Sequence, residues 1–400
     1  MKNDQECSLV NMITHLPDDL LLNCLARVSR LYYPILSLVS KRLRSLIASL
    51  ELYQTRTLLR HSESCLYLCL RFSSSSNPRW FTLCRRPSKI PNPNINPNSS
   101  PNPNTQWFTP CFKPHRSLKN QTKKEEKRSS NYLMVSVPTR NFSVESLPNH
   151  AVIGSNIYSI GIDSKLCSVK VFFLDCRSYT WHEAPSMRMK RIWPHMSVID
   201  GKIYVVEQWN VPPSNSIEIY DPKTQIWDYL PCPIAEILGQ KFMIKSLAID
   251  GKLYLCGDKC MVYKPMENKW DVVLGYETLF LWTQFKFSCV INNVLYSSKL
   301  SRVISWYDSD ERIWRYLKGL EELPKLPRSF SRLRLVNYGG KIAVLWEKSG
   351  VFSRKKMIWC AVIAVERRSG QEIYGIIEWC DVVLTVPKSC CVLESIAVTI

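Results

Sequence analysis

Tyr220-Asp221-Pro222-Lys223-Thr224-Gln225-Ile226-Trp227 is the clearest copy of a fragment that occurs four times along the chain. In every copy a tryptophan follows six residues after the second position; the other three are Leu174-Asp175 with Trp181, Tyr263-Lys264 with Trp270, and Tyr307-Asp308 with Trp314. Successive tryptophans are 46, 43 and 44 residues apart. A nearly fixed period of this length predicts stacked supersecondary units that bury their apolar faces against one another. Such arrays usually present a binding surface, so we expect recognition of a partner rather than catalysis.

Each unit also contains a tight turn between two apolar strands. Asp200-Gly201, Asp250-Gly251, Asn292-Asn293 and Gly339-Gly340 provide residues that tolerate the positive φ of hairpin turns, and Gly154-Ser155 stands at the same place in the first unit. A strand that ends in Tyr-Asp follows, and the tryptophan then opens a fourth strand. Four-stranded units repeated radially predict a mainly β fold, a β-propeller. A β-sandwich is the alternative, but it has no reason to repeat at a fixed period.

The number of blades depends on how the ends of this domain, residues 60–400, are used. Five units lie between residues 150 and 386. A hairpin at residues 65–84 reads as the last two strands of a further blade, and Ile396–Ile400 would add a strand beside it. Six blades result if both ends of the domain join in this way, because closure removes exposed sheet edges. Five blades are the alternative. Residues 85–140, rich in Pro and Asn and then in Lys, are expected to form a low-complexity, partly disordered basic loop.

Residues 12–55 have the apolar spacing of a small module of three short α-helices. Pro17 and the two carboxylates after it suit a first helical turn, Pro34 starts a second helix, and Ser40 caps a third. Three short helices in about 45 residues cannot enclose much of their own apolar surface. We therefore expect several leucines to contact another protein. The alternative is a small bundle that packs against the rest of this chain.

The helical segment is similar to an F-box. The resemblance rests on three stretches in order: Leu16-Pro17-Asp18-Asp19-Leu20, Cys24–Val28 and Leu36–Leu46. It implies a module that docks on the Skp-type adaptor of cullin–RING ubiquitin ligases. Carried over position by position, the adaptor contacts would fall on Leu16, Pro17, Leu20, Leu25, Val28, Leu36, Val39 and Leu43. Some of these side chains must instead pack in the module's own core.

The repeated units resemble kelch repeats, whose hallmarks are the tight turn and the Tyr-Asp…Trp spacing. Two departures stand out: the double glycine after the second strand is mostly lost, and Lys264 replaces the usual Asp. Together the two resemblances match the plant-type F-box/kelch-repeat family. They imply a substrate-recognition subunit of an SCF-type E3 ubiquitin ligase, in which the helices bind the adaptor and a kelch-type propeller binds a target protein. A kelch scaffold that binds partners without a ligase is the alternative.

No motif for nucleotide binding, serine hydrolysis or zinc proteolysis occurs, and the six histidines are scattered. We therefore assign no catalytic residue, metal or cofactor to this chain, and expect a non-catalytic subunit. A propeller oxidase or glycosidase is a third and less favoured reading, because such enzymes assemble their sites from residues whose spacing carries no signal.

A target surface is expected on the loops that join the second and third strands of a blade and on the links between blades. In an antiparallel blade these segments lie on the same face. They carry basic and aromatic side chains that suit an acidic protein: Arg188, Arg191, Trp193, Trp209, Trp282, Arg302, Arg328 and Lys355. An ordinary solvated rim is the alternative.

The charge balance also favours acidic partners, with 53 Lys and Arg against 34 Asp and Glu and a formal net charge of +19. No nucleic-acid motif accompanies this charge, so nucleic acid is not the expected partner.

The 16 cysteines, including Cys65/Cys69 and Cys256/Cys260, lack zinc spacing and are expected to be reduced thiols in a cytoplasmic or nuclear protein. No apolar run is long enough to span a membrane. Lys113–Arg128 is read as a solvated loop, with a nuclear-import signal or an anion patch as alternatives.

Overall fold

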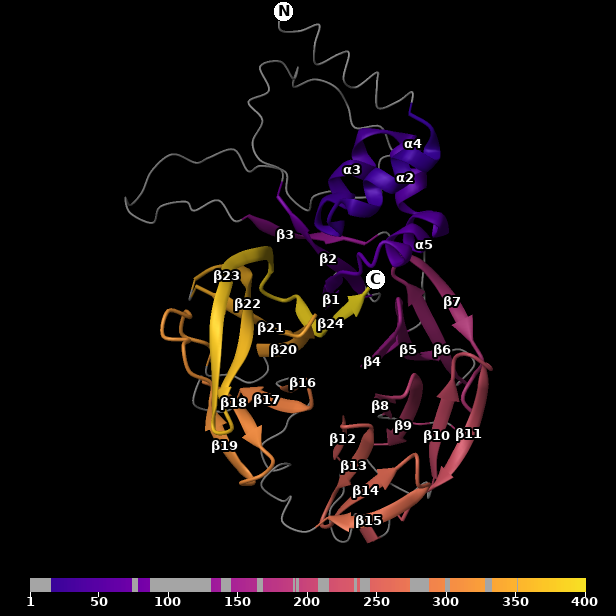
Figure 1. Ribbon diagram of the computed structural model, residues 1–400, viewed down its shortest axis with the longest axis vertical. Helices are drawn as coiled ribbons and strands as arrows, with labels where there is room; N and C mark the ends of the chain where they lie inside the picture. Colours follow the sequence, from indigo (N-terminus) through magenta and orange to yellow (C-terminus); the bar gives the residue numbers. More distant parts are fainter. Residues whose placement is uncertain are drawn as a thin grey trace, which may run out of the picture.

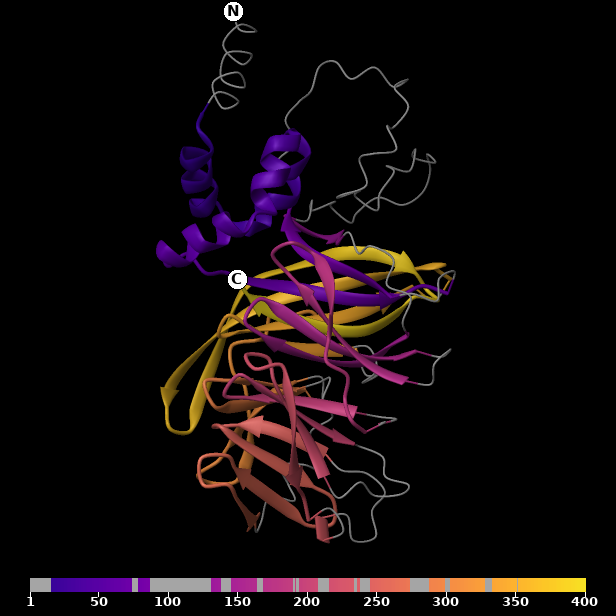
Figure 2. The same cartoon turned by 90° about the vertical axis from the view of Figure 1, so that its right-hand side faces the viewer.

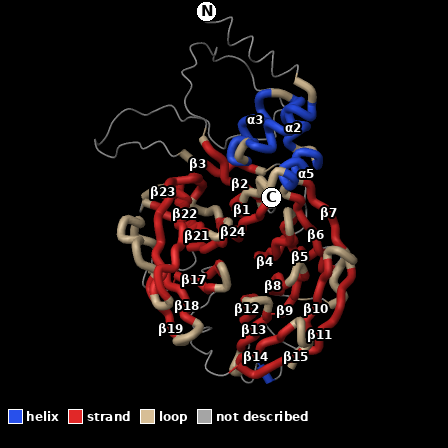
Figure 3. The backbone as a smooth tube through the Cα atoms, viewed as in Figure 1, coloured by secondary structure: helices blue, strands red, loops and turns tan. Residues whose placement is uncertain are grey.

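Six four-stranded sheets stand around a ring in the computed structural model, and a group of helices lies at one edge of that ring (Figure 1). The structure describes residues 16–73, 78–86, 131–137, 145–163, 168–189, 191, 194–207, 216–233, 236–237, 245–273, 288–298, 303–327, 333–350 and 352–400. Strands dominate the ring, whereas helices are nearly confined to the N-terminal segment (Figure 3). The β-propeller predicted from the period is therefore confirmed, with six blades and not the alternative five.

Five blades follow one another along the chain, each as a meander of four antiparallel strands. The first comprises β4 (Glu145–Ile153), β5 (Asn156–Asp163), β6 (Ser168–Asp175) and β7 (Thr180–Ala184). The second comprises β8 (Pro194–Ile199), β9 (Lys202–Glu207), β10 (Ser216–Asp221) and β11 (Ile226–Pro231). The third comprises β12 (Lys245–Ile249), β13 (Lys252–Cys256), β14 (Cys260–Lys264) and β15 (Lys269–Val273). The fourth comprises β16 (Ser288–Ile291), β17 (Val294–Ser298), β18 (Ile304–Asp308) and β19 (Ile313–Tyr316), and the fifth β20 (Leu333–Tyr338), β21 (Lys341–Ser349), β22 (Lys355–Ser369) and β23 (Glu372–Pro387).

The sixth blade joins the two ends of the domain. Its strand order is β24-β1-β2-β3, in which β24 (Cys391–Thr399) pairs antiparallel with β1 (Ser64–Arg71). The predicted closure of the ring is thus confirmed. The prediction that the hairpin forms the last two strands is wrong, because β1 and β2 (Arg79–Arg85) are the middle pair. The outer strand is β3 (Tyr132–Ser136), which lies inside the segment expected to be a loop. Residues 87–130 of that segment, with its basic run, and residues 138–140 lie outside the described residues.

The repeated turns have the backbone that their residues predict. Both residues of Asp200-Gly201, Asp250-Gly251, Asn292-Asn293 and Gly339-Gly340 have positive φ, which matches the right-handed twist of the strands they join. A second set of positive φ values falls two residues before each repeated tryptophan, at Tyr179, Gln225, Asn268 and Arg312. These turns bring the third and fourth strands of each blade together, so two turns per blade are fixed by local chemistry.

The aspartate of the repeat stabilises the second of these turns. In Asp221, Oδ1 accepts a hydrogen bond from the amide of Lys223 at 2.9 Å, and this bond lowers the pKa of the carboxyl group. Asp175 makes the same bond to the amide of Arg177. Lys264 cannot accept such a bond; its Nζ lies 2.8 Å from Asp271 across the strand pair instead. The substitution in the third repeat is therefore compensated by an ion pair.

The repeated tryptophan packs between neighbouring blades. Trp227 is buried among Tyr158, Ile160 and Met187 of the preceding blade. Its Nε1 donates to the carbonyl oxygen of Pro185 at 2.8 Å, in the link that leaves that blade. Burial of large aromatic surface between blades, with the indole N–H satisfied, is what holds such a ring together.

The N-terminal helical module consists of α2 (Asp18–Arg27), the 3-10 turn η1 (Arg30–Tyr32), α3 (Tyr33–Val39), α4 (Lys41–Ile47) and α5 (Leu50–Leu58). The prediction of three helices is wrong, because a new helix begins after Ser49, whose side chain accepts a hydrogen bond from the amide of Leu52. Ser40 caps α4 as expected. Pro17 precedes α2 as its N-cap residue instead of occupying the first turn. No helix within the described ranges is long and apolar enough to cross a membrane.

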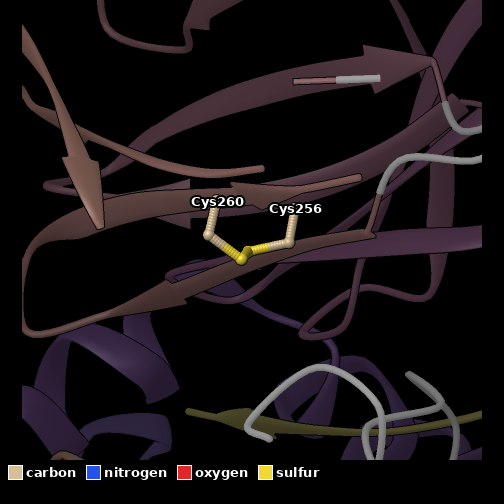
Figure 4. The surroundings of a disulfide bond; sticks show 2 residues. All are labelled: Cys256 and Cys260. Carbon is tan, nitrogen blue, oxygen red and sulfur yellow. A yellow bond between two sulfur atoms is a disulfide. The ribbon is translucent and has the colours of Figure 1, made fainter. Parts of the chain in front are cut away.

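Cys256 and Cys260 form a disulfide bond, so the expectation that both are free thiols is wrong (Figure 4). They are direct cross-strand partners at the ends of β13 and β14, with Cα atoms 4.2 Å apart. The hairpin register thus brings the two sulfur atoms together. Cys65 and Cys69 are buried thiols, in line with the prediction for that pair. Burial raises the pKa of the thiols of Cys84 and Cys232 to about 12.

Candidate functional site

The helical module leaves apolar side chains of α2 and α3 in solvent. Leu20 on α2 is 53% exposed, and Leu38 and Val39 at the end of α3 are 46% and 62% exposed. Both helices pack on α4. Exposed leucine and valine on two neighbouring helices of one small module form an apolar surface of the kind that marks a protein contact. We call Pro17, Leu20, Leu38 and Val39 the apolar helix surface.

The structure separates the eight residues predicted to contact an adaptor. Leu25 and Leu43 are buried in the module's own core with Ala26, Ile47 and Leu52, and Val28 and Leu36 pack partly against that core. Leu20, Val39 and Pro17 are exposed, and Leu16 is half-buried. Leu38 was not predicted. On α3, Ser37 before it is buried and Val39 after it is exposed, and only the packing on α4 shows which residues reach solvent.

Arg42 of α4 fixes the chain at the start of this surface. Its Nη2 lies 2.6 Å from Oδ1 of Asp18, and the same nitrogen donates to the carbonyl oxygen of Leu16. Asp18 also lies in the first turn of α2, where a carboxylate complements the helix dipole. Leu16 and Pro17 are therefore held against α4. Arg42 was outside the predicted site, although the paired carboxylates after Pro17 were a signal that a cation would lie nearby.

A buried polar cluster beneath the helices ties the module to the propeller. Arg56 of α5 donates from Nη1 to the carbonyl oxygens of Ala26 and Val28 and to the hydroxyl of Tyr33. Burial raises the pKa of Tyr33 to about 12, so this hydroxyl stays protonated. Tyr53 donates to the carbonyl oxygen of Arg177 in the β6–β7 turn at 3.2 Å. The module is thus fixed to the ring by specific bonds.

These contacts define two faces of the ring. The turns between first and second strands and between third and fourth strands lie on one face, which we call the turn face. The end of β24 and the start of β1, a first and a second strand, also lie on this face, and Figure 2 shows the helices beside the C terminus there. The loops between second and third strands and the links between blades lie on the opposite face, which we call the loop face. Two hydrogen bonds show that loops and links share this face. Ser73 Oγ, in the β1–β2 loop, donates to the carbonyl oxygen of Ser389 in the β23–β24 link. The amide of Lys388 in the same link donates to the carbonyl oxygen of Arg354 in the β21–β22 loop. The helical module contacts the turn face: Tyr53 bonds to the β6–β7 turn, and Glu63 pairs with Ile400 where β24 ends.

Three of the eight predicted target residues lie among the described residues. Arg188 is exposed and its guanidinium lies 5.2 Å from the ring centre of Tyr229. Lys355 is exposed at the start of β22, close along the chain to the fully exposed Phe352. Arg191 is only 1% exposed and pairs with Glu218, so in this structure it is not available to a target. Trp193, Trp209, Trp282, Arg302 and Arg328 lie outside the described residues.

Tyr229 and Phe352 were missed by the sequence prediction. Tyr229 follows the repeated tryptophan by two residues, and only the fold places it beneath Arg188. Phe352 stands in a loop between two long strands, where its exposure depends on the loop's path. Within the described part of the chain, His, Cys, Asp and Glu side chains form no group of three that could hold a metal ion.

Comparisons with known proteins agree with this architecture. The family described as "F-box domain" matches residues 13–55, and the family described as "FKB95, Kelch-repeats domain" matches residues 107–384. Two putative F-box/kelch-repeat proteins of Arabidopsis thaliana are 57% identical over 97% of this chain and 98% of their own length, and 58% identical over 100% of both. An F-box/kelch-repeat protein of the same plant is 42% identical over 96% of this chain and 93% of its own.

Proposed function

This chain belongs to the F-box/kelch-repeat proteins, and on that premise we propose that it is the substrate-recognition subunit of an SCF-type ubiquitin ligase. The helical module would bind the Skp-type adaptor and, through it, a cullin–RING ligase. The propeller would hold a target protein on its loop face. The exposed basic residues there suit an acidic target, because charge steers the encounter and aromatic side chains anchor it.

In this role the chain contributes position and no catalytic group. The partner complex carries activated ubiquitin, and holding the target beside it converts an encounter in solution into a tethered one with a high effective concentration. Such a gain depends on the geometry between the two binding sites. Tyr53 donates to the carbonyl oxygen of Arg177 and Arg30 to that of Cys176, and these bonds, which hold the module against the ring, support this requirement.

The observation that carries the proposal is the apolar helix surface. The core of the module is filled by Leu25, Leu43 and Leu52, yet Leu20 and Val39 remain in water. The exposed part of such an apolar side chain is stabilised when a partner removes it from water, by about 25 cal/mol per Å². The surface also lies away from the loop face, so both partners can bind at the same time.

The test is adaptor capture by the full chain carrying Leu20→Ser and Val39→Ser. Both positions are exposed, so the variant should keep the circular dichroism and melting temperature of the parent chain while losing at least tenfold in adaptor affinity. Leu58→Ser is the matched control, because Leu58 is an exposed leucine of α5 outside the predicted contact. Its adaptor binding should be unchanged.

Undiminished adaptor binding by the Leu20/Val39 variant would remove the proposed docking surface. If the parent chain itself fails to bind any Skp-type adaptor but still captures partner proteins, the alternative of a scaffold without a ligase is favoured. Ubiquitin transfer to captured proteins, reconstituted with adaptor, cullin and RING subunit, then separates a working receptor from a mere adaptor-binding protein.

A further inference from the structure

Five basic side chains gather on the loop face where the fifth and sixth blades meet. All five are exposed: Arg71 and Arg79 flank the β1–β2 loop, Arg354 and Lys355 lie at the β21–β22 loop, and Lys388 lies in the β23–β24 link. We call these five residues the basic patch. Figure 2 shows the indigo ribbon of β1 and the yellow ribbons of the last strands ending close together on the side away from the helices.

Hydrogen bonds join the three segments that carry the basic patch. The amide of Lys388 donates to the carbonyl oxygen of Arg354 at 2.9 Å, which joins the β23–β24 link to the β21–β22 loop. Oγ of Ser73 donates to the carbonyl oxygen of Ser389 at 3.2 Å, which joins the β1–β2 loop to the same link. The basic patch is therefore one surface and not a set of separate positions.

Three of these cations surround the boundary between the two blades. The guanidinium of Arg79 lies 5.1 Å from the ring centre of Phe72, and Phe72 packs against the core between the fifth and sixth blades. Arg354 and Lys388 lie across that boundary, on the fifth blade and on the link that leaves it. An anion at this boundary could accept hydrogen bonds from both blades.

The basic patch has no carboxylate of its own. Among the residues that the structure describes, none of its five side chains takes part in an ion pair. Glu347, near the end of β21, pairs with the buried Lys356 at 2.8 Å, so its charge is already neutralised. Elsewhere, Lys252 and Lys318 have carboxylate partners. Five unpaired charges of one sign on one surface attract an anionic partner.

The other charges of the loop face limit the width of that partner. Glu236 in the β11–β12 link, and Glu321 and Glu322 in the β19–β20 link, are exposed carboxylates on the same face. A partner broad enough to cover the whole face, such as an anionic membrane or a nucleic-acid duplex that crosses the ring, would bring its negative charge against these glutamates. A single polypeptide segment can contact the basic patch alone, so a segment of a protein fits this face better.

The density of positive charge favours phosphates over carboxylates. In an extended segment, side chains on one side recur about every 7 Å, so a run of acidic residues offers one unit charge per step. A phosphoserine carries a charge of about −1.5 to −2 at neutral pH and three acceptor oxygens, so one residue can accept hydrogen bonds from two or three cations. Arginine, which supplies most of the basic patch, is the side chain best suited to bidentate contact with phosphate.

We infer that the basic patch binds a phosphorylated segment of the target protein, with a phosphate between Arg79, Arg354 and Lys388. This inference rests on the proposed function, because the segment belongs to the protein that the propeller would hold. Target capture then requires a kinase to act first, so the reaction that supplies the substrate of this subunit is phosphoryl transfer to a protein.

The experiment measures the retention of synthetic peptides by the immobilised full chain at near-physiological salt. The probes are three pools of peptides of about 11 residues with the same random positions, in which two fixed positions hold phosphoserine, glutamate or serine. We expect the phosphoserine pool to be retained at least about tenfold more than the glutamate pool, because each phosphate carries more charge and more acceptors. The serine pool should not be retained.

A charge-reversed variant places the site. Arg79→Glu/Lys388→Glu should lower retention of the phosphoserine pool by at least about tenfold, and both positions are exposed, so the melting temperature should match that of the parent chain. Lys41→Glu/Lys223→Glu is the matched control, because it changes the net charge equally at exposed lysines of the helical module and the turn face. It should retain the phosphoserine pool as the parent does.

Equal retention of the glutamate and phosphoserine pools would show that the basic patch detects negative charge of any kind and would overturn the inference. Equal retention by the parent and the charge-reversed chain would show that the peptides bind elsewhere. A parent chain that retains no pool would also contradict the inference. Tighter binding to phosphatidylserine vesicles or to duplex DNA at the same salt, lost in the charge-reversed chain, would assign the basic patch to a membrane or to nucleic acid instead.

Adaptor capture, measured on the same chains, separates this inference from the proposed function. A chain that captures the adaptor but does not prefer the phosphoserine pool contradicts the inference alone. A chain that prefers the phosphoserine pool but captures no adaptor contradicts the ligase role alone.

Discussion

Arg191 and Glu218 form an ion pair that is almost completely removed from solvent, with Nε of Arg191 3.2 Å from Oε2 of Glu218. The other carboxylate oxygen of Glu218 accepts from the backbone amides of Arg188 and Met189. One glutamate of β10 therefore holds the link from β7 to β8. The arginine expected to face a target instead secures the segment that presents Arg188.

Replacing Glu218 by Gln should destabilise the propeller by about 3–5 kcal/mol, because it leaves the charge of Arg191 buried without its carboxylate. The midpoint of urea denaturation measures this loss. The double variant Glu218→Leu/Arg191→Met removes both charges and should be less destabilised than Glu218→Gln. A double variant that is worse than the single one would show that the pair is not the dominant interaction here.

Gly319→Ala should destabilise the contact between the fourth and fifth blades by about 1–3 kcal/mol. Gly319 has a φ of +79°, and an added Cβ would lie 2.5 Å from the carbonyl oxygen of Gly375. That contact is maintained by the amide of Gly375, which donates to the carbonyl oxygen of Lys318 at 2.8 Å. Gly370→Ala is the control, since its Cβ would meet no atom within 4 Å. Equal unfolding midpoints for the two variants would contradict the argument.

The stability of the ring should fall between about pH 6.5 and pH 4. Burial lowers the pKa of His195 to about 4, and its Nδ1 lies 2.6 Å from Oγ of Ser246 across β8 and β12. Neutral imidazole is therefore favoured in the folded chain, so the contribution is complete above the unfolded pKa of about 6.5 and is lost as the pH falls through the folded pKa. The shift corresponds to about 3 kcal/mol at most. His195→Gln should flatten the curve of unfolding midpoint against pH in this window, and an unchanged curve would exclude His195 as its cause.

Target capture should depend on the loop face. The triple variant Arg188→Ala/Phe352→Ala/Lys355→Ala should reduce the proteins captured from cells with blocked proteasomes by at least about tenfold, because charge and aromatic anchors are removed together. Lys252→Ala, a lysine of a hairpin on the turn face, is the matched control. Adaptor binding should be the same for all chains. Full capture by the triple variant would show that the target does not bind at these residues of the loop face.

The repeat period predicted the architecture, since four tryptophans at one spacing require four similar units. The strand β3 was missed because Tyr132–Ser136 is five residues long and follows a long polar stretch, so it carries too little pattern to be read. It becomes an outer strand because it pairs with β2, which lies more than 40 residues earlier in the chain. The disulfide was missed for a related reason: three residues between Cys256 and Cys260 look like ordinary strand spacing until the hairpin register is known.

The candidate sites were predictable in kind and not in detail. The stretches around Leu16 and Leu36 indicated an adaptor-binding module, but periodicity does not tell Leu25, which is buried, from Leu20, which is exposed. Arg191 was misassigned because a loop arginine looks solvent-facing unless its partner is visible. Glu218 lies 27 residues later on another strand. A cavity beside Arg30, between the helices and the propeller, had no sequence signal, because its walls come from the helices and from three blades that are far apart in the sequence.

The last strand, β24, is only nine residues long, and Ile400 exchanges two backbone hydrogen bonds with Glu63 beneath the helices. During translation β24 leaves the ribosome after the helices and the other strands of the ring, so the helices can fold while the circle is still open. A premature stop codon before β24 would yield a polypeptide that keeps the helical module but exposes β1 as a bare edge. Under the proposed function, such a product would occupy adaptors without carrying a target, so β24 would matter to the ligase as much as the helices do.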